Sequence, residues 1–532
     1  MKTRLLFIAI FCSILFSPLL ANKKAISNSP TETSSSNSEV FFNVKKFGAL
    51  GDGKNLDSKA INLAIDAAFN AGGGTVYIPA GNYWSGSIRL KSNIHLFIEQ
   101  GATIIAATVN AENDYDEAET SISNKYQDYG HSYFKNSLIW GYDLVNVSIT
   151  GTGLINGKNL YHGLKGKHGD FTDSTDVDTQ TANKAICFYR CRNVILRDFS
   201  ILSGGWFGIL ATGVDNLTID NLKIDTNRDG MDIDCCKNVR ISNCHVNSPT
   251  DDGICLKSTY ALGYTRDTEN LTISNCIVSG FVEGSLLDGT YLRTPHHWYG
   301  VRPIGRIKFG TESNGGFKNI AITNCVFNYC RGIAIETVDG GSIEDVVISN
   351  ITMRDVVSDP IFIRLGSRMR GPKDTPIGSI KRLKISNLIA YNVNPEFVST
   401  IAGLVGHSIE DVELSNISFY YKGGGEKGDL DKPIPENDGG YPEPGLFGRK
   451  LPVYGLFVRH VKNLQLNNVN LYYLNDDARI PLLFDDVQGA EIRFVNAQKA
   501  KDAEALVLMN SSNIKVFESL GMKNKVLGKL KK

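Results

Sequence analysis

Three aspartates occupy matching places in two neighbouring repeats of the sequence. Asp229 follows Asn216 by 13 residues, and Asp251 follows Asn238 by the same interval. Matching the two Asp-Gly pairs instead aligns Asp229 with Asp252, which leaves one extra residue in the second repeat. If the repeats are stacked coils, their backbones lie about 4.8 Å apart, so either alignment brings three carboxyl groups together.

Carboxyl groups held this close disfavour joint ionisation, which raises the pKa of at least one of them. Glycoside hydrolysis uses such a set, because one protonated carboxyl donates to the leaving oxygen while an ionised partner activates water. Two other interpretations stay open, since corner aspartates can simply cap turns and stacked carboxylates can bind a hard cation such as calcium. The neighbouring Asn227 and Lys257 are predicted to contact the same ligand.

The repeat itself predicts the fold. An Asn-type residue leads into alternating apolar residues, and the shortest spacing between such residues is 22 or 23. Asparagine tolerates the left-handed backbone of a sharp corner, and period-two alternation buries one face of a short strand. The pattern starts at Asn146, Asn193, Asn216, Asn238, Asn270, Asn319, Asp345, Arg382, Asp411 and Asn463.

Short strands at this spacing, with no helix between them, predict an all-β protein whose single domain is a right-handed parallel β-helix. A leucine-rich repeat would need a denser leucine frame, and a β-propeller would show hairpins with two-residue turns. The open end of such a sheet needs a cover. Residues 57–71 have helical periodicity, so we expect an N-terminal capping helix there. Longer spacings indicate loop insertions at about 283–304 and 422–450.

The N-terminal sequence has the layout of a secretory signal peptide. A short basic leader, Met1–Arg4, precedes an apolar run that ends at Leu20, and the small residue Ala21 follows. We therefore expect residues 1–21 to be a signal peptide, 22–39 a disordered tether and 40–532 the β-helix domain. The protein is then secreted or periplasmic and has no membrane span.

The amino-acid composition limits which binding partners and cofactors can be expected. Lys plus Arg and Asp plus Glu both number 56, so net charge gives no reason to expect nucleic acid. Nine of the ten cysteines follow the leader, and several stand at matching repeat positions, such as Cys244, Cys276 and Cys325. Stacked cysteines behave as small buried hydrophobes, so we expect most of them in the core, with one disulfide at most. We expect a monomer without a cofactor or a bound metal.

Several motifs resemble glycoside hydrolase family 28, the polygalacturonase family. Residues 227–230, Asn-Arg-Asp-Gly, are similar to the family's Asn-Thr-Asp-Gly, and residues 251–253, Asp-Asp-Gly, to its paired aspartates. The likeness extends over most of the chain after the leader, and at 310–316 it is closest to exo-acting members. The segments 42–54, 74–83 and 351–356 carry it further.

The resemblance implies inverting hydrolysis of an α-linked uronide in a pectic polysaccharide, without a cofactor. It also implies a role for each aspartate. Asp251 would be the general acid, while Asp229 and Asp252 would hold and activate the water.

Two family motifs are altered in this sequence. Members usually carry Gly-His-Gly in the third coil, where this chain has Gly-Arg-Ile-Lys-Phe-Gly at 305–310. They carry Arg-Ile-Lys in the fourth coil, where this chain has Ala334 and Glu336. Alternation places Arg306 and Lys308 on one strand face, so they either bind an anionic sugar or form a solvated outer face. Glu336 argues against an unaltered galacturonate subsite, which makes a rhamnogalacturonan-type substrate the alternative.

The two insertions are expected to shape a substrate groove. Aromatic side chains beside a catalytic corner often stack on sugar rings, which singles out Tyr291 and Trp298, although either could pack within its own loop. The 422–450 loop could close one end of a cleft, as would suit an exo-acting enzyme. Two other function classes remain: a calcium-dependent polysaccharide lyase on the same fold, and a non-catalytic β-helix that binds glycan.

Overall fold

The computed structural model describes residues 41–108, 115–119, 126–127, 130–161, 164–165, 170–171, 182–293 and 303–527. The predicted signal peptide and tether lie outside the described residues, and so does Trp298. The part of the chain from Val40 onward forms one compact unit.

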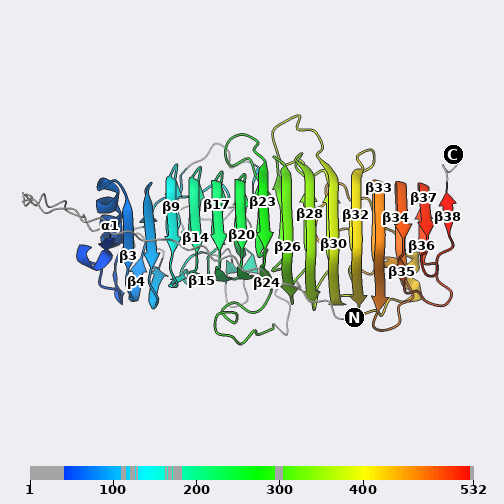
Figure 1. Ribbon diagram of the computed structural model, residues 1–532, viewed down its shortest axis with the longest axis horizontal. Helices are drawn as coiled ribbons and strands as arrows, with labels where there is room; N and C mark the ends of the chain where they lie inside the picture. The colour runs from blue at the N-terminus through cyan, green and yellow to red at the C-terminus, as the bar shows by residue number, and fades with distance from the viewer. Residues whose placement is uncertain are drawn as a thin grey trace, which may run out of the picture. The chain divides into compact units, whose positions relative to one another are not determined.

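This unit is a right-handed parallel β-helix, which confirms the predicted fold class. Successive coils stack along one axis, and nearly every strand pairs in parallel with the strands of the coils before and after it (Figure 1). The pairings sort the strands onto three faces. One face carries β5 (Ile88–Arg89), β8 (Ile139–Tyr142), β13 (Lys184–Tyr189), β16 (Phe207–Thr212), β19 (Asp229–Asp234), β22 (Ile254–Ser258), β25 (Ile307–Ser313), β27 (Ile333–Thr337), β29 (Ile361–Leu365), β31 (Ser399–Ala402) and β36 (Leu506–Met509). We call this the β19 face.

The other two faces complete each coil. The second carries β1 (Phe41–Asn43), β3 (Gly74–Ile78), β6 (Ile94–Ile98), β9 (Val145–Thr150), β14 (Arg192–Arg197), β17 (Asp215–Asp220), β20 (Lys237–Ser242), β23 (Thr268–Ser274) and β37 (Ser512–Phe517). The third carries β2 (Asp52–Leu56), β4 (Gly81–Ser85), β7 (Ala102–Ala106), β10 (Leu154–Asn156), β15 (Ser200–Leu202), β18 (Lys223–Asp225), β21 (His245–Asn247), β24 (Ile277–Ser279) and β35 (Asn496–Ala497).

In later coils, single strands turn the corner between faces. Those that join the second and third faces are β26 (Phe317–Asn328), β28 (Ser342–Arg354), β30 (Ser379–Val393) and β32 (Ile409–Tyr421). Strands β33 (Val453–Tyr473) and β34 (Ile480–Arg493) begin on the β19 face and continue onto the second, and β33 extends onto the third, where it pairs with β35. The remaining pairs are antiparallel, β11 (Leu164–Lys165) with β12 (Asp170–Phe171), and β37 with β38 (Lys525–Leu527).

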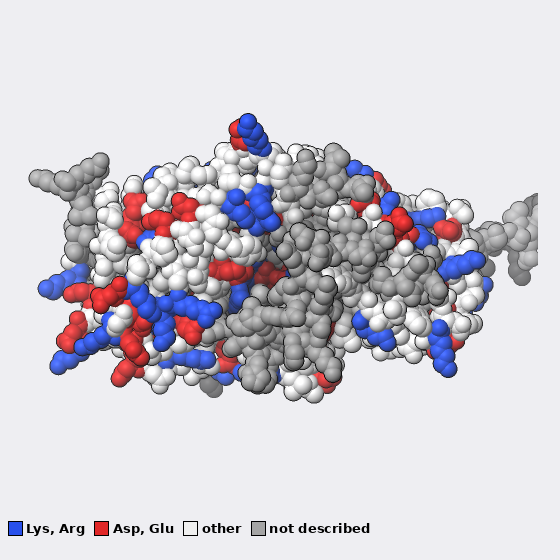
Figure 2. Space-filling view, turned by 180° about the vertical axis from the view of Figure 1, so that it is seen from behind, with Lys and Arg blue, Asp and Glu red and all other residues white. Residues whose placement is uncertain are grey.

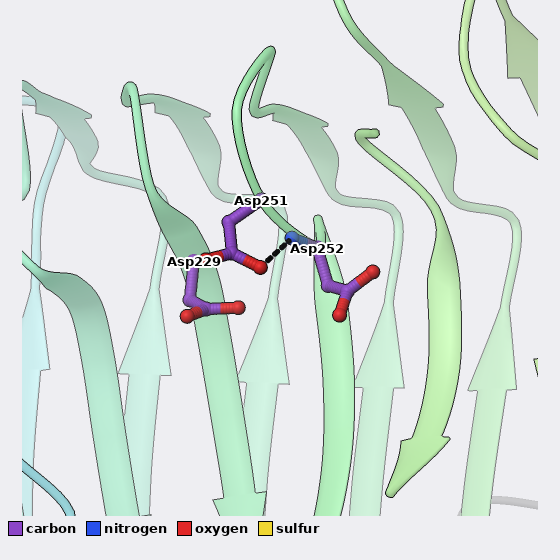
Figure 3. A group of neighbouring side chains, drawn as sticks. All are labelled: Asp229, Asp251 and Asp252. Atoms are coloured by element: carbon purple, nitrogen blue, oxygen red, sulfur yellow. Dashed lines mark hydrogen bonds between the residues drawn. The ribbon is translucent and has the colours of Figure 1, made fainter. Parts of the chain in front are cut away.

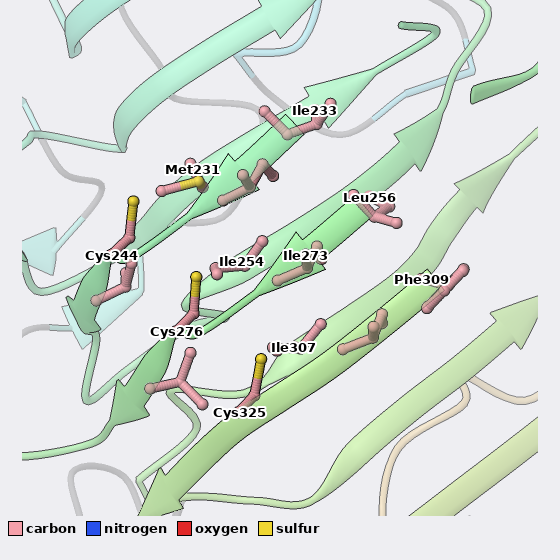
Figure 4. Packing of buried hydrophobic residues seen from close by; sticks show 14 of the residues in the cluster. Met231, Ile233, Cys244, Ile254, Leu256, Ile273, Cys276, Ile307, Phe309 and Cys325 are labelled. Atoms are coloured by element: carbon pink, nitrogen blue, oxygen red, sulfur yellow. The ribbon is translucent and has the colours of Figure 1, made fainter. Parts of the chain in front are cut away.

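The core consists of like residues stacked on successive coils. Leu217, Val239 and Leu271 are direct neighbours in the parallel register, and each is at most 1% exposed. Cysteines stack in the same manner at Cys244 and Cys276 and onward to Cys325 (Figure 4). All nine cysteines of the described chain are buried and free, so the core placement is confirmed and the described residues contain no disulfide.

The corner asparagines form a ladder along the outside. Asn193, Asn216 and Asn238 have φ values of 58°, 55° and 58°, which is the left-handed conformation that their sequence positions predicted. The Asn216 side-chain amide donates to Asn193 Oδ1 at 2.9 Å, and that of Asn238 donates to Asn216 Oδ1 at 3.3 Å. The ladder therefore satisfies polar groups at the corner while it keeps the coils in register.

A helix covers the first coil, as expected. Helix α1 (Ser58–Asn70) buries Ile61, Ala64 and Ile65 against the strands beneath it. The preceding Asp57 does not cap the helix, because its carboxylate accepts the backbone N–H groups of Leu50 and Gly51 at 2.7 and 3.1 Å. A short 3₁₀ helix, η1 (Val44–Phe47), adjoins α1.

Long connections interrupt the coils where the spacing indicated insertions. Residues 280–306 link β24 to β25, and residues 422–452 link β32 to β33 and contain η3 (Lys427–Asp431). A third long connection, 107–138 between β7 and β8, was not predicted. Among the described residues, no helix is long and apolar enough to cross a membrane.

The ladder makes a prediction for Asn216. Asn216→Ala should lower the thermal unfolding midpoint, because alanine loses the amide bonds and also bears about 1–2 kcal/mol of left-handed backbone strain. Asn216→Gly loses the same bonds without the strain and should fall between wild type and Asn216→Ala in calorimetry. An alanine variant as stable as the glycine variant would contradict this account of the corner.

Candidate active site

The structure brings the three predicted aspartates together on the β19 face. Asp229 begins β19, while Asp251 and Asp252 lie in the corner that precedes β22 (Figure 3). Oxygen atoms of all three carboxyl groups lie within 4.8 Å of one another. Met231 pairs with Ile254, which aligns Asp229 with Asp252 and makes Asp251 the extra residue of its corner. The register thus settles which of the two sequence alignments the fold uses.

Asp251 is the most accessible of the three carboxyl groups. Its side chain is 24% exposed, and Arg228 binds it with an Nη2–Oδ2 distance of 2.7 Å. The Arg228 guanidinium lies 4.2 Å from the centre of the Trp206 ring, which fixes its position. Asp251 Oδ1 also accepts the backbone N–H of Asp252 at 3.0 Å. These contacts fix the position of the partly exposed Asp251 carboxylate at the corner.

Asp252 is buried beside two basic residues. Arg306 Nε donates to Asp252 Oδ1 at 2.8 Å, and Lys308 Nζ lies 3.4 Å from Oδ2. Burial alone would raise the pKa of Asp252, but Lys308 and Arg306 more than offset this and hold the pKa well below its ordinary value. Asp252 therefore stays ionised.

Asp229 has the opposite environment. Burial raises the pKa of Asp229 well above its ordinary value, and the neighbouring Asp251 raises it further. Its Oδ1 atom is buried without a hydrogen-bond partner in the described structure. Since the three groups interact, their protons belong to the cluster as a whole, and Asp229 is where burial favours a proton.

Arg306 and Lys308 do not form a solvated face. Both side chains are almost completely buried, and they bind the carboxylates of Asp252, Glu336 and Glu443. Glu336 lies on β27 with Lys308 at 3.6 Å and Arg306 at 4.0 Å. Burial raises the pKa of Glu336 to about 7, although Lys308 and Arg306 oppose this shift. The predicted basic pair thus belongs to a network of protein charges.

A second polar cluster lies beside the aspartates, and the sequence predicted only one of its members, Lys257. His131, from the connection 107–138, has Nε2 2.7 Å from Asp232 Oδ2 and Nδ1 3.9 Å from Glu312 Oε1. Lys257 donates to Glu312 Oε2 at 2.8 Å. An imidazole therefore reaches this face from an earlier loop, although the segment 305–310 contains no histidine. His131 lies outside the repeat, so no periodic signal marked it.

Three other residues were predicted to contact the ligand, and the structure gives less support for that role. Asn227 is half-buried at the corner before β19, and its backbone oxygen accepts the Thr250 hydroxyl at 2.6 Å. Tyr291 is half-exposed and packs edge-on against Phe281, with 5.6 Å between ring centres. Its ring therefore packs within its own insertion. Trp298 lies outside the described residues.

The aspartates could also offer oxygen ligands to a hard cation. Such a cation would compete with Arg228 for Asp251 and with Arg306 and Lys308 for Asp252. This donor set fits a proton-transfer site better than a calcium site, because bound positive charge already balances two of the three carboxylates.

The surface around this face has mixed charge. Figure 2, which views the molecule from the side opposite to Figure 1, shows acidic and basic side chains beside one another on the described surface.

Comparisons with known proteins agree with this architecture. The family described as rhamnogalacturonase A/epimerase, pectate lyase-like, matches residues 41–255. A probable polygalacturonase of Vitis vinifera is 24% identical over 406 residues, which cover 70% of this chain and 73% of that protein. A mannuronan C5-epimerase of Azotobacter vinelandii is 51% identical, but over 73 residues that make up 12% of this chain and 7% of the epimerase.

Two solved structures share the fold. The hyperthermoactive exopolygalacturonase of Thermotoga maritima superposes with a TM-score of 0.56 at 21% identity and covers 72% of this chain and 87% of its own. The family 28 exopolygalacturonase of Yersinia enterocolitica has a TM-score of 0.53 at 19% identity. The superposition covers 89% of this chain and 78% of the Yersinia chain. Fold and site together define a right-handed parallel β-helix protein with an aspartate cluster on one face. Its sequence relatives make it a protein similar to glycoside hydrolase family 28.

The environment of Glu336 predicts a pH-dependent effect on stability. A carboxyl group whose pKa is raised in the folded state stabilises the fold at low pH, and this contribution is lost as pH rises through the raised value. As pH rises from about 5 to about 8, wild type should therefore lose this stabilisation, whereas Glu336→Gln has no such carboxyl group to ionise. The difference in free energy of unfolding, variant minus wild type, should grow by roughly 3 kcal/mol over this range. Thermal denaturation across this range measures the difference. Glu410→Gln, at an exposed ion pair with Lys462, is the control and should show little change; an equal change in both variants would contradict the assignment.

Proposed function

We propose that this chain is a glycoside hydrolase that cleaves an α-linked uronide of a pectic polysaccharide by inversion, without a cofactor. The observation that carries the proposal is a cluster of three carboxyl groups within 4.8 Å in which the surroundings of Asp229 and Asp252 favour opposite protonation states. Glycoside hydrolysis needs that difference, because the acid and the base act in the same step. The similarity to a polygalacturonase supports the substrate class.

Each aspartate has a distinct role in this proposal. Asp251 protonates the leaving glycosidic oxygen as the bond to the anomeric carbon breaks, since it is the most accessible of the three. In the free protein the proton of the cluster resides on Asp229, and it passes to Asp251 within the cluster. Water attacks the anomeric carbon and gives its proton to Asp252, which Arg306 and Lys308 keep ionised.

The inverting outcome rests on the resemblance to family 28. Separations within 4.8 Å are shorter than the roughly 6.5–9.5 Å of most inverting pairs and closer to the ~5–5.5 Å of retaining pairs. The configuration of the first product therefore tests this part of the proposal separately.

A rhamnogalacturonan-type polysaccharide is the second candidate substrate. The observation that favours it is the pairing of Arg306 and Lys308 with protein carboxylates, which leaves them less suited to bind a galacturonate. The matching family description also includes rhamnogalacturonase A. A calcium-dependent lyase and a non-catalytic glycan-binding protein are the competing function classes.

We also propose that the chain is exported by its N-terminal leader, Met1–Ala21, and acts as a monomer outside the cytoplasm. The substrate is a polymer of the cell wall, which a periplasmic or extracellular enzyme can reach.

The purified protein should be incubated with a panel of pectic polysaccharides, with and without a chelator. Hydrolysis gives saturated products that resist the chelator, and NMR of the first product from an α-linked substrate should show the β-anomer. Unsaturated uronides that vanish with the chelator would support the lyase. Saturable binding without new reducing ends would support the binding protein.

Asp251→Asn tests the general acid. We expect kcat to fall by about 10²–10⁴-fold on the substrate that the panel identifies, because the leaving oxygen loses its proton donor. Asp411→Asn is the matched control, since it makes the same change at a corner where other coils already have asparagine. Near-wild-type turnover by Asp251→Asn, in protein that folds normally, would refute the role of Asp251.

The pH profile should follow the two shifted aspartates. Activity should fall with rising pH as Asp229 loses its proton, and it should persist at low pH until Asp252 is protonated, below the ordinary range of a carboxyl group. Lys308→Met raises the pKa of Asp252 and should move the acidic limb of kcat/KM upward. Lys318→Met, at an ion pair with Asp267 on the second face, should leave the limb in place.

A further inference from the structure

A glutamate from a distant loop reaches the predicted basic pair. Glu443 lies in the connection 422–452, which follows β32, five coils along the β19 face from Asp252. Its Oε1 atom lies 2.7 Å from Arg306 Nη2 and 3.5 Å from Lys308 Nζ. Its Oε2 atom binds Arg331. One carboxylate thus contacts three cationic side chains.

Glu443 covers these cations on the solvent side. The side chains of Arg306 and Lys308 are 1% and 3% exposed, whereas that of Glu443 is 29% exposed. A ligand that approaches this part of the β19 face therefore meets the Glu443 carboxylate before it meets the buried cations. Asp252 and Glu336 bind the same cations from the protein side.

The loop is anchored on both sides of Glu443. Before it, Arg459 donates to the backbone oxygens of Ile434 and Pro435 at 3.1 and 2.9 Å, and His460 contacts Glu436 at 3.0 Å. The hydroxyl of Tyr441 accepts from Thr311 at 3.0 Å.

After Glu443, Phe447 packs against Phe457 with 5.7 Å between ring centres, within a small core that includes Val398 and Leu451. Arg364 lies 5.2 Å from the Phe447 ring. These contacts place Glu443 as a built part of the site rather than as a side chain of a loose loop.

We propose that Glu443 determines substrate specificity by occupying the place that a sugar carboxylate would take, so that the unit bound over Arg306, Lys308 and Arg331 is a neutral sugar. This rests on the proposed function and refines its substrate class. A carboxylated unit at this place would meet a like charge, and the cations beneath it are already paired with Glu443, Asp252 and Glu336. A neutral unit instead has hydroxyl groups that can donate hydrogen bonds to the partly exposed Glu443 carboxylate. The substrate is then a polymer in which a neutral sugar adjoins the cleaved uronide bond.

The test compares two ligands that differ in one chemical group. An oligogalacturonate and its carboxyl-reduced, neutral counterpart are titrated by calorimetry into Asp251→Asn protein, with and without Glu443→Gln. We expect Glu443→Gln to strengthen binding of the carboxylated ligand roughly tenfold. This change corresponds to about one charge-assisted hydrogen bond between the ligand carboxylate and a cation that Glu443 no longer neutralises. Binding of the neutral ligand should change less than about threefold, because it makes no such bond.

Glu436→Gln is the matched control on the same loop. It weakens the anchor at His460 and Arg459 without touching the three cations. An equal gain in this variant would mean that loosening the loop, not removing the Glu443 charge, admits the ligand, and would overturn the proposal. It would also be overturned if the protein with Glu443 intact already preferred the carboxylated ligand, or if neither ligand bound.

The outcome is separable from that of the proposed function. The titrations need no turnover, so they report on the subsite even if the panel shows no hydrolysis. Conversely, hydrolysis that Asp251→Asn abolishes would stand even if Glu443→Gln left both affinities unchanged. Circular dichroism and the thermal midpoint of each variant exclude misfolding as the cause of lost binding.

Discussion

The parallel stacking of coils about 4.8 Å apart governs the remainder of this structure. Each strand satisfies its backbone groups with the coils on either side, so residues at equivalent positions become close neighbours whatever their chemistry. Leucine and valine stack into the core at Leu217 and Val239, and asparagines stack into a corner ladder. The same constraint brings Asp229 beside Asp252, where stacking is electrostatically unfavourable.

The protein offsets that cost by surrounding each carboxyl group differently. Asp252 has Arg306 and Lys308 from the following coil, and Asp251 has Arg228 from the preceding corner. At Asp229, burial and the neighbouring Asp251 outweigh the opposing effects of Lys257 and Arg228 and raise the pKa, so a proton is the simplest way to neutralise it. Further along the face, Glu336 follows the basic pair. From Asp252 onward, charges of opposite sign thus follow one another on successive coils, and their balance sets which groups can donate or accept a proton.

The insertions provide what the repeat cannot. A coil of fixed length presents side chains only at regular positions, whereas a loop can cross several coils and place one residue freely. His131 comes from the connection before β8 and Glu443 from the connection before β33, yet both end on the β19 face near the aspartates. The rigid solenoid supplies the platform, and the loops supply the irregular groups that distinguish one ligand from another.

The sequence by itself determined the solenoid, its corners and the aspartate cluster. These features rest on local periodicity, because alternation, left-handed asparagines and equal spacing act within one coil or between adjacent coils. It also predicted the capping helix and two of the long insertions, and it identified the coil that carries Arg306 and Lys308. Only the tertiary structure decided which loop residues reach the charged groups of this face. Glu443 is 137 residues from Arg306, and His131 is 101 residues from Asp232, in segments without a repeat. Their positions depend on how long loops pack against the finished solenoid, and no periodic pattern in the chain records that packing.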